Sequence, residues 1–355
     1  MKTVNDLICI VLTFMCISCV KTEGTDIPSV KIDFTNISHI GQTEGTIVNL
    51  ETSDSSLLYD ICRFNVVRDT FVVHSRNFVR LFSKTGKFIG DVSQTGPGPN
   101  EYTQISNIFF ENDEVGIFES NKNTVKWFNL SGGLSASREV AISDINIRPF
   151  HLYPSGNGYV ALNSYGGESA DRKTLCFLNK ELNQGESIEG RSLRTGFSTY
   201  DDIYIDRSGK VLYWEMLCDT LFMVDNSTLV PSFVVDFGEY AIPEDIASKD
   251  VYERINYVNE LDKSGKKFAG MARYYQRIDN KVYFSCMSPE KEILLCQYIE
   301  NEGTIRLFAI DFDSEKYKTS SCFLIRDNVI YWEIHDQKDL TLNPSLFILD
   351  LNELK

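Results

Sequence analysis

Arginine recurs at three spaced positions of the chain that could together bind an anion. Arg63, Arg148 and Arg273 each precede a copy of a repeated hydrophobic strand. In the other copies the same position holds Asn107, Asp202 and Ser321. Guanidinium groups that converge in a protein of net charge −15 repel one another unless carboxylates or an anionic ligand lie between them. The pattern therefore predicts a ligand-binding set of Arg63, Asn107, Arg148, Asp202 and Arg273.

Glutamate recurs with a similar alternation, at the end of the repeated strand itself. The six aligned residues are His74, Glu119, Asn163, Glu215, Ser285 and Glu333. A ring of carboxylates could hold a divalent metal. Carboxylates beside the arginines would instead form structural clamps, so that the arginines would be paired within the protein. The residue pattern leaves the clamp and the ligand site open as alternatives.

Sequence motifs of catalysis are absent from the chain. It has no Gly-x-Ser-x-Gly elbow, phosphate-binding Walker loop, H-E-x-x-H helix or EF-hand loop. The histidines and cysteines show no zinc-ligand spacing, and the cysteines beyond residue 19 lie mostly in apolar runs, which favours buried thiols. The segment Gly96-Pro97-Gly98-Pro99 lacks amide donors at its prolines, which indicates a rigid loop rather than a phosphate site.

Short strands in a regular repeat must position these residues. From about residue 60 onward, runs of Val, Ile, Phe and Tyr alternate with Asp, Asn, Gly and Lys turns. One strand recurs six times, as FVVHS, VGIFES, YVALNS, VLYWEM, VYFSC and VIYWEI. Another recurs as VKWFNL, LCFLNK and LFMVDN at a spacing of roughly 46 to 50 residues, the period of a four-stranded propeller blade. The fold predicted is an all-β, six-bladed β-propeller with four-stranded antiparallel blades.

This architecture constrains the two candidate sets. The arginines fall on inner strands that line the axis, whereas the glutamates lie one strand further out, roughly 10 Å from the axis. That distance is too long for metal bonds, so we expect the glutamates to form hydrogen bonds between blades, with no metal and no cofactor. Trp214, Trp332, Tyr200 and Tyr204 could stack on sugar rings, but aromatic residues in propellers usually fill the space between blades.

The ends of the chain predict how the ring closes. The last blade runs through SLFILDL at 345–351 and stops without a fourth strand. The segment SVKIDF at 29–34 resembles the outer strand SFVVDF at 232–237, so we expect residues 29–34 to complete the last blade. The charged stretch 243–268 lacks strand alternation and predicts a helical insertion between blades four and five, which could serve as a docking element for a partner.

The N-terminal residues indicate export. The apolar run 7–17 is too short to span a bilayer and fits a secretory signal. Ser18 and Cys19 follow it as in bacterial lipoproteins, so we predict a signal peptide over 1–18, lipidation of Cys19, a polar tether over 19–28 and a propeller over 29–355. Cys16 stands where leucine is usual in such signals, which leaves ordinary signal-peptide cleavage as the alternative.

Composition excludes some partners. The 355 residues are 43% hydrophobic and 24% charged, typical of a chain that folds around a core. Fifty acidic residues against 35 basic ones argue against nucleic acid or an anionic membrane surface as a partner recognised through bulk charge. We expect a monomer.

The motifs together resemble a known group, the six-bladed β-propeller lipoproteins of Bacteroidetes, whose blades look like NHL repeats. LFSKTGKFIGDVSQTGPGPNEY at 81–102 is similar to the strand, turn and Gly-Pro-Gly-Glu-Tyr signature of that family, with Asn100 in place of a glycine. CDTLFMVDNSTLVPSFVVDFGEYAIPEDI at 218–246 resembles its Asp-Thr strand and Asp-Phe-Gly strand. The resemblance implies the fold and a lipid-anchored place in the cell envelope, but no common activity.

The sequence therefore favours a binding module at the cell envelope, without catalysis, for a ligand or an envelope protein. The alternative is a metal-dependent propeller hydrolase or lactonase resembling gluconolactonases and NHL lyases. In that case Asn107, Asp202 and Glu119 would be the candidate ligands of the divalent metal.

Overall fold

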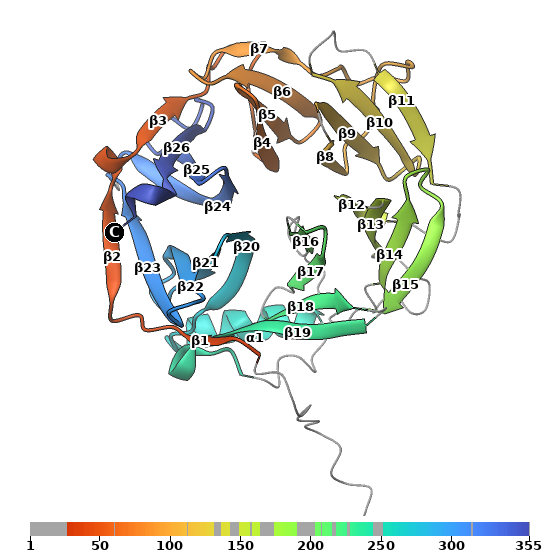
Figure 1. Ribbon diagram of the computed structural model, residues 1–355. Helices are drawn as coiled ribbons and strands as arrows, with labels where there is room; N and C mark the ends of the chain where they lie inside the picture. Colours follow the sequence, from red (N-terminus) through yellow and green to blue (C-terminus); the bar gives the residue numbers. More distant parts are fainter. Residues whose placement is uncertain are drawn as a thin grey trace, which may run out of the picture.

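Six β-sheets are arranged in a ring around a central axis (Figure 1) in the computed structural model. The structure describes residues 27–59, 61–111, 113–130, 136–142, 149–156, 158–163, 174–189, 203–206, 208–214, 218–225, 228–243, 251–313 and 315–354. The four strands nearest the axis in each blade run antiparallel from the axis toward the rim, as the strand repeats predict.

Blades 1 to 3 each contain four strands in chain order. Blade 1 comprises β4 (Arg63–Val67), β5 (Thr70–Ser75), β6 (Phe78–Ser83) and β7 (Phe88–Asp91). Blade 2 comprises β8 (Asn107–Glu111), β9 (Glu114–Glu119), β10 (Thr124–Asn129) and β11 (Ala136–Ala141). Blade 3 comprises β12 (Pro149–Ser155), β13 (Gly158–Asn163), β14 (Thr174–Asn179) and β15 (Gln184–Glu189).

Blades 4 to 6 each include a strand from the N-terminal segment. Blade 4 comprises β16 (Ile203–Ile205), β17 (Val211–Trp214), β18 (Thr220–Asp225), β19 (Thr228–Asp236) and β1 (Ser29–Lys31). Blade 5 comprises β20 (Gly270–Ile278), β21 (Lys281–Met287), β22 (Ile293–Ile299), β23 (Thr304–Asp311) and β2 (Ile37–Gly41). Blade 6 comprises β24 (Tyr317–Arg326), β25 (Val329–Asp336), β26 (Ser345–Asp350) and β3 (Thr46–Asn49).

The remaining elements are short. Three 3₁₀ turns are η1 (Gln42–Glu44), η3 (Gly238–Tyr240) and η5 (Leu351–Glu353). The helix α1 (Val251–Lys263) lies between blades 4 and 5, which confirms the predicted helical insertion within its described part. In the view of Figure 1, α1 lies behind β18 and β19 of blade 4. None of the helices in the described part of the chain is long and apolar enough to cross a membrane.

The hydrophobic core is divided among the spaces between blades. The six repeated strands are the second strands of their blades, and nearly every described residue within them is buried, because both faces of a blade pack against neighbouring blades. Trp127, Trp214 and Trp332 are at most 1% exposed in this packing. The two candidate tryptophans are therefore core residues, as expected.

The N-terminal segment closes the ring differently from the prediction. β3 completes blade 6 by antiparallel pairing with β26, for example Ile47 with Phe347. The predicted closing segment, 29–34, instead contains β1, which adds a parallel fifth strand to blade 4 with Val30 opposite Val235. β2 does the same for blade 5 by pairing with β23. We call residues 29–49, which run across three blades, the N-terminal strap.

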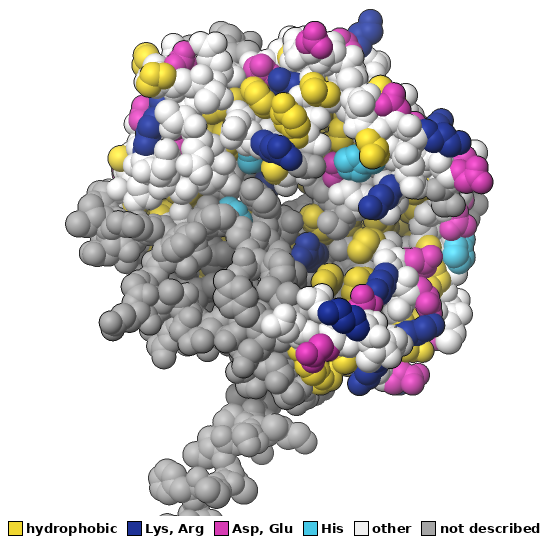
Figure 2. Space-filling view, turned by 180° about the vertical axis from the view of Figure 1, so that it is seen from behind, with side chains coloured by type: hydrophobic (Ala, Val, Ile, Leu, Met, Phe, Trp, Pro, Cys, Tyr) yellow, Lys and Arg dark blue, Asp and Glu magenta, His cyan; other side chains and the backbone are white. Residues whose placement is uncertain are grey.

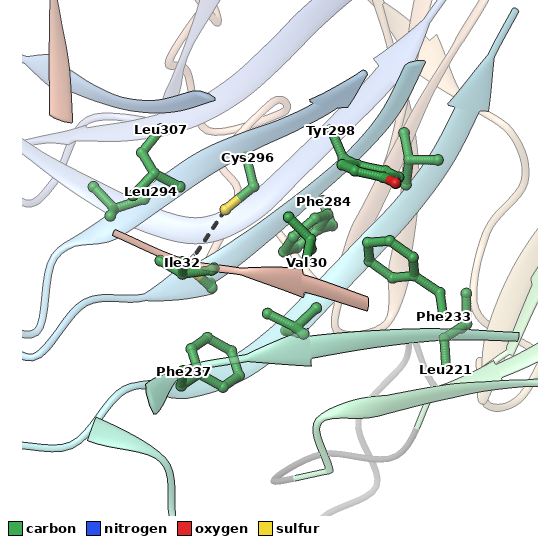
Figure 3. Packing of buried hydrophobic residues seen from close by; sticks show 14 of the residues in the cluster. Val30, Ile32, Leu221, Phe233, Phe237, Phe284, Leu294, Cys296, Tyr298 and Leu307 are labelled. Carbon is green, nitrogen blue, oxygen red and sulfur yellow. Dashed lines mark hydrogen bonds between the residues drawn. The ribbon is translucent and has the colours of Figure 1, made fainter. Parts of the chain in front are cut away.

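The strap also supplies side chains to the core. Val30 and Ile32 are both 4% exposed and pack between blades 4 and 5 (Figure 3). Phe233 and Phe284 belong to the same cluster, with ring centroids 5.9 Å apart. Segments 29–34 and 232–237 resemble each other because they lie side by side and bury alternate residues in one core, and not because they hold equivalent places in two blades.

The described cysteines are thiols. Cys176, Cys286 and Cys296 are buried, whereas Cys62 and Cys218 are partly exposed. The sulfurs of Cys286 and Cys296 lie 3.4 Å apart in the cluster of Figure 3, and burial raises the pKa of the Cys296 thiol well above its usual value.

The strap yields a test of its contribution to stability. Val30→Asp places a charge in the core between blades 4 and 5, and we expect it to lower the free energy of unfolding by about 2 to 4 kcal/mol. Ser29→Asp is the matched control, because Ser29 is exposed on the same strand. Urea unfolding followed by tryptophan fluorescence measures both. Equal stability of the two variants would show that β1 is not part of the cooperative fold.

Candidate functional site

An axial cavity of about 350 Å³ lies inside the ring. All six inner strands, β4, β8, β12, β16, β20 and β24, contribute to its wall. In the rear view of Figure 2, dark-blue basic side chains border the opening at the centre of the ring. The volume falls within the range of small-molecule sites, and only the ring as a whole forms it.

Aromatic side chains make up much of the cavity wall. Tyr153, Tyr204, Tyr274, Tyr275 and Phe323 line it. The rings of Tyr274 and Phe323 lie 4.4 Å apart between blades 5 and 6. The rings of Tyr204 and Tyr275 lie 6.3 Å apart between blades 4 and 5. Tyr204 packs against the core between blades 4 and 5, as expected, and also lines the cavity, whereas Tyr200 lies outside the described residues.

A backbone irregularity in β20 holds this wall in place. The pairing of β20 with β21 slips on both sides of Arg273, and Met271 and Tyr274 adopt left-handed backbone angles of φ 54° and 59°. Such bulges re-aim side chains and leave a backbone group outside the ladder. Here the Tyr274 N–H donates to the Tyr204 hydroxyl at 3.0 Å, which ties blade 5 to blade 4 beside the cavity.

Among the described residues, Arg63 is the candidate arginine that lines the cavity. It begins β4, and its guanidinium carbon lies 5.4 Å from the centre of the Tyr153 ring. Its Nη1 donates to the Ile108 carbonyl at 3.5 Å, the limit of a hydrogen bond. None of the described carboxylates forms an ion pair with it. The structure thus supports the inner-strand position that the sequence indicates for Arg63.

Asn107 occupies the equivalent place in blade 2 but acts as a clamp between blades. Its side chain is fully buried, with Nδ2 donating to the Leu152 carbonyl at 2.8 Å and Oδ1 accepting from the Leu152 N–H at 3.1 Å. Both polar atoms of the amide are thereby engaged with the backbone of blade 3. Asn107 does not line the cavity.

The other three candidates are not brought into the described cavity wall. Arg273 lies on the inner strand β20, as expected, and its carbonyl accepts from the Ser285 hydroxyl at 3.5 Å, but its side chain is not part of the lining. Arg148 and Asp202 lie outside the described residues. Of the two candidate arginines in the described part of the chain, Arg63 lines the cavity and Arg273 does not.

Glu119 is offset by one residue from the column of aligned second-strand residues, and Glu215 lies outside the described residues. Arg63 pairs with His74 and Arg273 with Ser285, as the sequence alignment has it. In blade 2, however, Asn107 pairs with Phe118, so Glu119 lies one residue further on. A one-residue offset turns a side chain to the other face of a strand. Glu119 therefore does not occupy the position in its blade that His74 and Ser285 occupy in theirs.

Glu119 has a structural role. Its Oε1 accepts from the N–H and the hydroxyl of Thr103, at 2.6 and 2.7 Å, in the loop that leads into blade 2. Burial favours the protonated carboxyl, but the hydrogen bonds from Thr103 and the charge of Lys122 outweigh it and hold the pKa of Glu119 below its usual value. Glu119 is fully buried and does not line the cavity.

The glycine-proline loop is also structural. Glu101 Oε2 accepts from the Gly98 N–H at 2.8 Å, and its Oε1 accepts from Gln94 at 2.6 Å. The buried Lys126 donates to the Glu101 carbonyl at 2.7 Å. These bonds fix the loop between blades 1 and 2, in agreement with the rigid loop predicted from the sequence.

Two of the three residues named for the metal-dependent alternative bond to the backbone instead of grouping as metal ligands. Asn107 and Glu119 bind the backbone of Leu152 and Thr103, and Asp202 is outside the described residues. Among the residues that the structure describes, no three His, Cys, Asp or Glu side chains are grouped as metal ligands. We therefore derive no chemistry through a metal from this site.

The fold and the cavity define a six-bladed β-propeller with an aromatic axial cavity. The family described as "Domain of unknown function (DUF4934)" matches residues 35–338, and the chain belongs to this family. The resemblance to propeller proteins of Bacteroidetes is thus confirmed, while lipidation stays a prediction. A search of curated proteins gives no match.

Several solved structures are similar to this chain over most of its length. A protein of Bacteroides fragilis described as exported is similar with a TM-score of 0.67 and 17% identity, over 91% of this chain and 99% of that one. A DUF4221 family member from Bacteroides vulgatus is similar with a TM-score of 0.47 and 10% identity, over 86% and 98% of the two chains. An inactive virginiamycin B lyase of Staphylococcus aureus, solved with quinupristin, has a TM-score of 0.44 and 11% identity, over 86% and 99%.

The histidine opposite Arg63 predicts a pH dependence. His74 is 1% exposed and bonds the Arg76 carbonyl through Nε2, at 3.0 Å. Burial, together with the charge of Arg63, lowers the pKa of His74 from 6.5 to about 4. The unfolded chain therefore takes up this proton more readily, and stability present above pH 6.5 is lost as the pH falls toward 4. The loss is on the order of 3 kcal/mol.

We expect His74→Gln to abolish this loss, so the stability difference between the wild type and the variant shrinks from pH 7 to pH 4. Urea unfolding across that range measures it. His39→Gln is the control: Asp311 raises the pKa of the exposed His39, so its contribution is present at low pH and fades as the pH rises. A difference for His74→Gln that does not change with pH would contradict the assignment.

Proposed function

We propose that this protein is an exported, non-catalytic binding module of the cell envelope, whose small-molecule ligand occupies the axial cavity. The observation that carries the proposal is the cavity itself. It combines aromatic walls with a few polar groups, among them Arg63, Asn65 and Gln276, which is the composition of small-molecule sites.

The irregular inner strand supports this assignment. A left-handed tyrosine in a strand costs conformational energy that a purely structural inner strand does not require. At Tyr274 the distortion places an aromatic ring on the cavity wall and is held by the Tyr204 hydroxyl. Strain of this kind concentrates at binding and catalytic sites.

Location in the envelope is supported by the N-terminal sequence and by the B. fragilis protein described as exported. The described part of the strap begins on blade 4 at the rim of the ring. A lipid on Cys19 would therefore hold the propeller by its rim and leave the axial opening clear of the attachment point. The tether over 19–28 would span at most about 35 Å.

The anchor is tested by Cys19→Ser, which removes the sulfur that would carry the lipid. We expect the wild-type protein in the washed membrane fraction of its native host and the variant in the soluble fraction. Cys16→Ser is the matched control and should stay with the membrane. A Cys19→Ser protein that still sediments with membranes contradicts lipidation while leaving the cavity assignment untouched.

The cavity is tested by alkylation of two cysteines. Cys62 lines the cavity, whereas Cys218 is also partly exposed but lies outside the lining. A ligand in the cavity should slow the reaction of N-ethylmaleimide with Cys62 and leave Cys218 unchanged, as measured by peptide mass spectrometry. The probes are galacturonate, galactose, benzoate and benzamide. The melting temperature of the protein is measured with each probe as well. A probe that raises the melting temperature without protecting Cys62 binds elsewhere. If no probe raises the melting temperature, the small-ligand role is wrong.

A further inference from the structure

The cavity has an electrostatic character opposite to that of the whole chain. The protein carries a net charge of −15, yet Arg63 is the one charged side chain in the described lining of the cavity. Acidic side chains are absent from that described lining. The site therefore offers a cation inside a low-dielectric wall, where an opposite charge is attracted more strongly than in water.

Arg63 has unused bonding capacity toward a ligand. A guanidinium carries five N–H donors, and the described contacts of Arg63 are the long bond to the Ile108 carbonyl and the face of Tyr153. Asn107, at the equivalent place, makes two short bonds to the next blade. Asn107 thus uses its side chain to hold blades 2 and 3 together, whereas Arg63 keeps most of its N–H donors at the cavity.

Two polar groups near Arg63 supply no counter-charge. The strand partner of Arg63 is His74, which is neutral at pH 7 because burial lowers its pKa to about 4. Burial also raises the pKa of the Tyr275 hydroxyl to about 12, so that this group keeps its proton. Neither residue supplies the negative charge that Arg63 lacks within the described lining.

The walls fit a ring. Tyr274 and Phe323 form one packed aromatic pair and Tyr204 and Tyr275 another, on either side of β20. Each wall offers an apolar face of the kind that stacks against sugar or aromatic rings. The cavity of about 350 Å³ has room for one or two such rings and not for a long polymer.

We propose that the ligand is a small ring compound that bears a carboxylate, held by Arg63 through its charge and by the tyrosine walls through its ring. This inference rests on the proposed function and specifies the ligand class of the same cavity. The carboxylate would accept two parallel hydrogen bonds from the guanidinium, the arrangement in which arginine binds carboxylates most selectively. The ring could belong to an acidic sugar or to an aromatic acid.

The test compares acids with neutral partners of similar shape. Isothermal titration calorimetry measures galacturonate against galactose and benzoate against benzamide, with the full mature protein. We expect at least one acid to bind about tenfold or more tightly than its neutral partner, the advantage of a charge-assisted hydrogen bond. Which acid binds better separates the sugar from the aromatic source.

Substitutions then assign the preference to Arg63. Arg63→Gln should remove the advantage of the acid, whereas Arg63→Lys, which keeps the charge without the planar fork, should retain part of it. Arg306→Gln is the matched control, because Arg306 is exposed on the outer strand β23 and should leave the binding of both acids unchanged. If Arg63→Gln does not fold, the partial loss in Arg63→Lys carries the test.

The possible results separate this inference from the proposed function. Equal binding of acid and neutral partner, or an acid preference that survives in Arg63→Gln, overturns the ligand class; protection of Cys62 by the same compound would still support the cavity as a binding site. No binding by any of the four probes, together with no protection of Cys62, overturns both.

Discussion

The pairing of Thr46–Asn49 with the last strand of blade 6 is the interaction on which the rest of the structure depends. A ring of separate sheets has no single core, since each space between blades is filled from two neighbours. The ring stays closed only while the last blade is joined to the segment of chain that leads into blade 1. β3 makes that connection directly, because the chain leaves it and proceeds to β4 of blade 1. The axial cavity exists only within this closed circle, and its wall takes residues from every blade.

Much of this architecture could be predicted from the sequence, because blade strands repeat their residues. The six second strands, their turns and the helical insertion follow from local alternation and spacing. The strand that closes the ring does not follow from local alternation and spacing. SVKIDF and SFVVDF share a pattern because Val30 and Val235 lie opposite each other and their segments bury residues in one core. Two segments have similar sequences when they lie in similar environments. This happens when they hold equivalent positions in two blades, and also when they are neighbouring strands of one blade.

The candidate site could be predicted only in part. Strand position alone predicts that Arg63 lies at the axis, and Arg63 lines the axial cavity in the structure. Asn107 holds the same position in the ladder, but its shorter side chain reaches the backbone of Leu152 and is used there. The aromatic wall escaped prediction for a different reason. The bulge at Met271 and Tyr274 breaks the alternation from which the face of a residue is read, and no glycine marks it at Tyr274. The alternation rule therefore fails in the inner strand β20, which is also the strand whose bulge shapes the cavity wall.

The N-terminal strap also has a consequence for how the protein reaches its folded state. The strap is synthesised long before its strand partners: Val30 precedes Val235, and Ile47 precedes Phe347, by about 200 and 300 residues. Contacts so distant along the chain slow folding, because the intervening loop must be ordered before they form. The strands of blades 4 to 6 meanwhile offer open edges to other chains. A chain of this topology gains from completing its synthesis before folding begins.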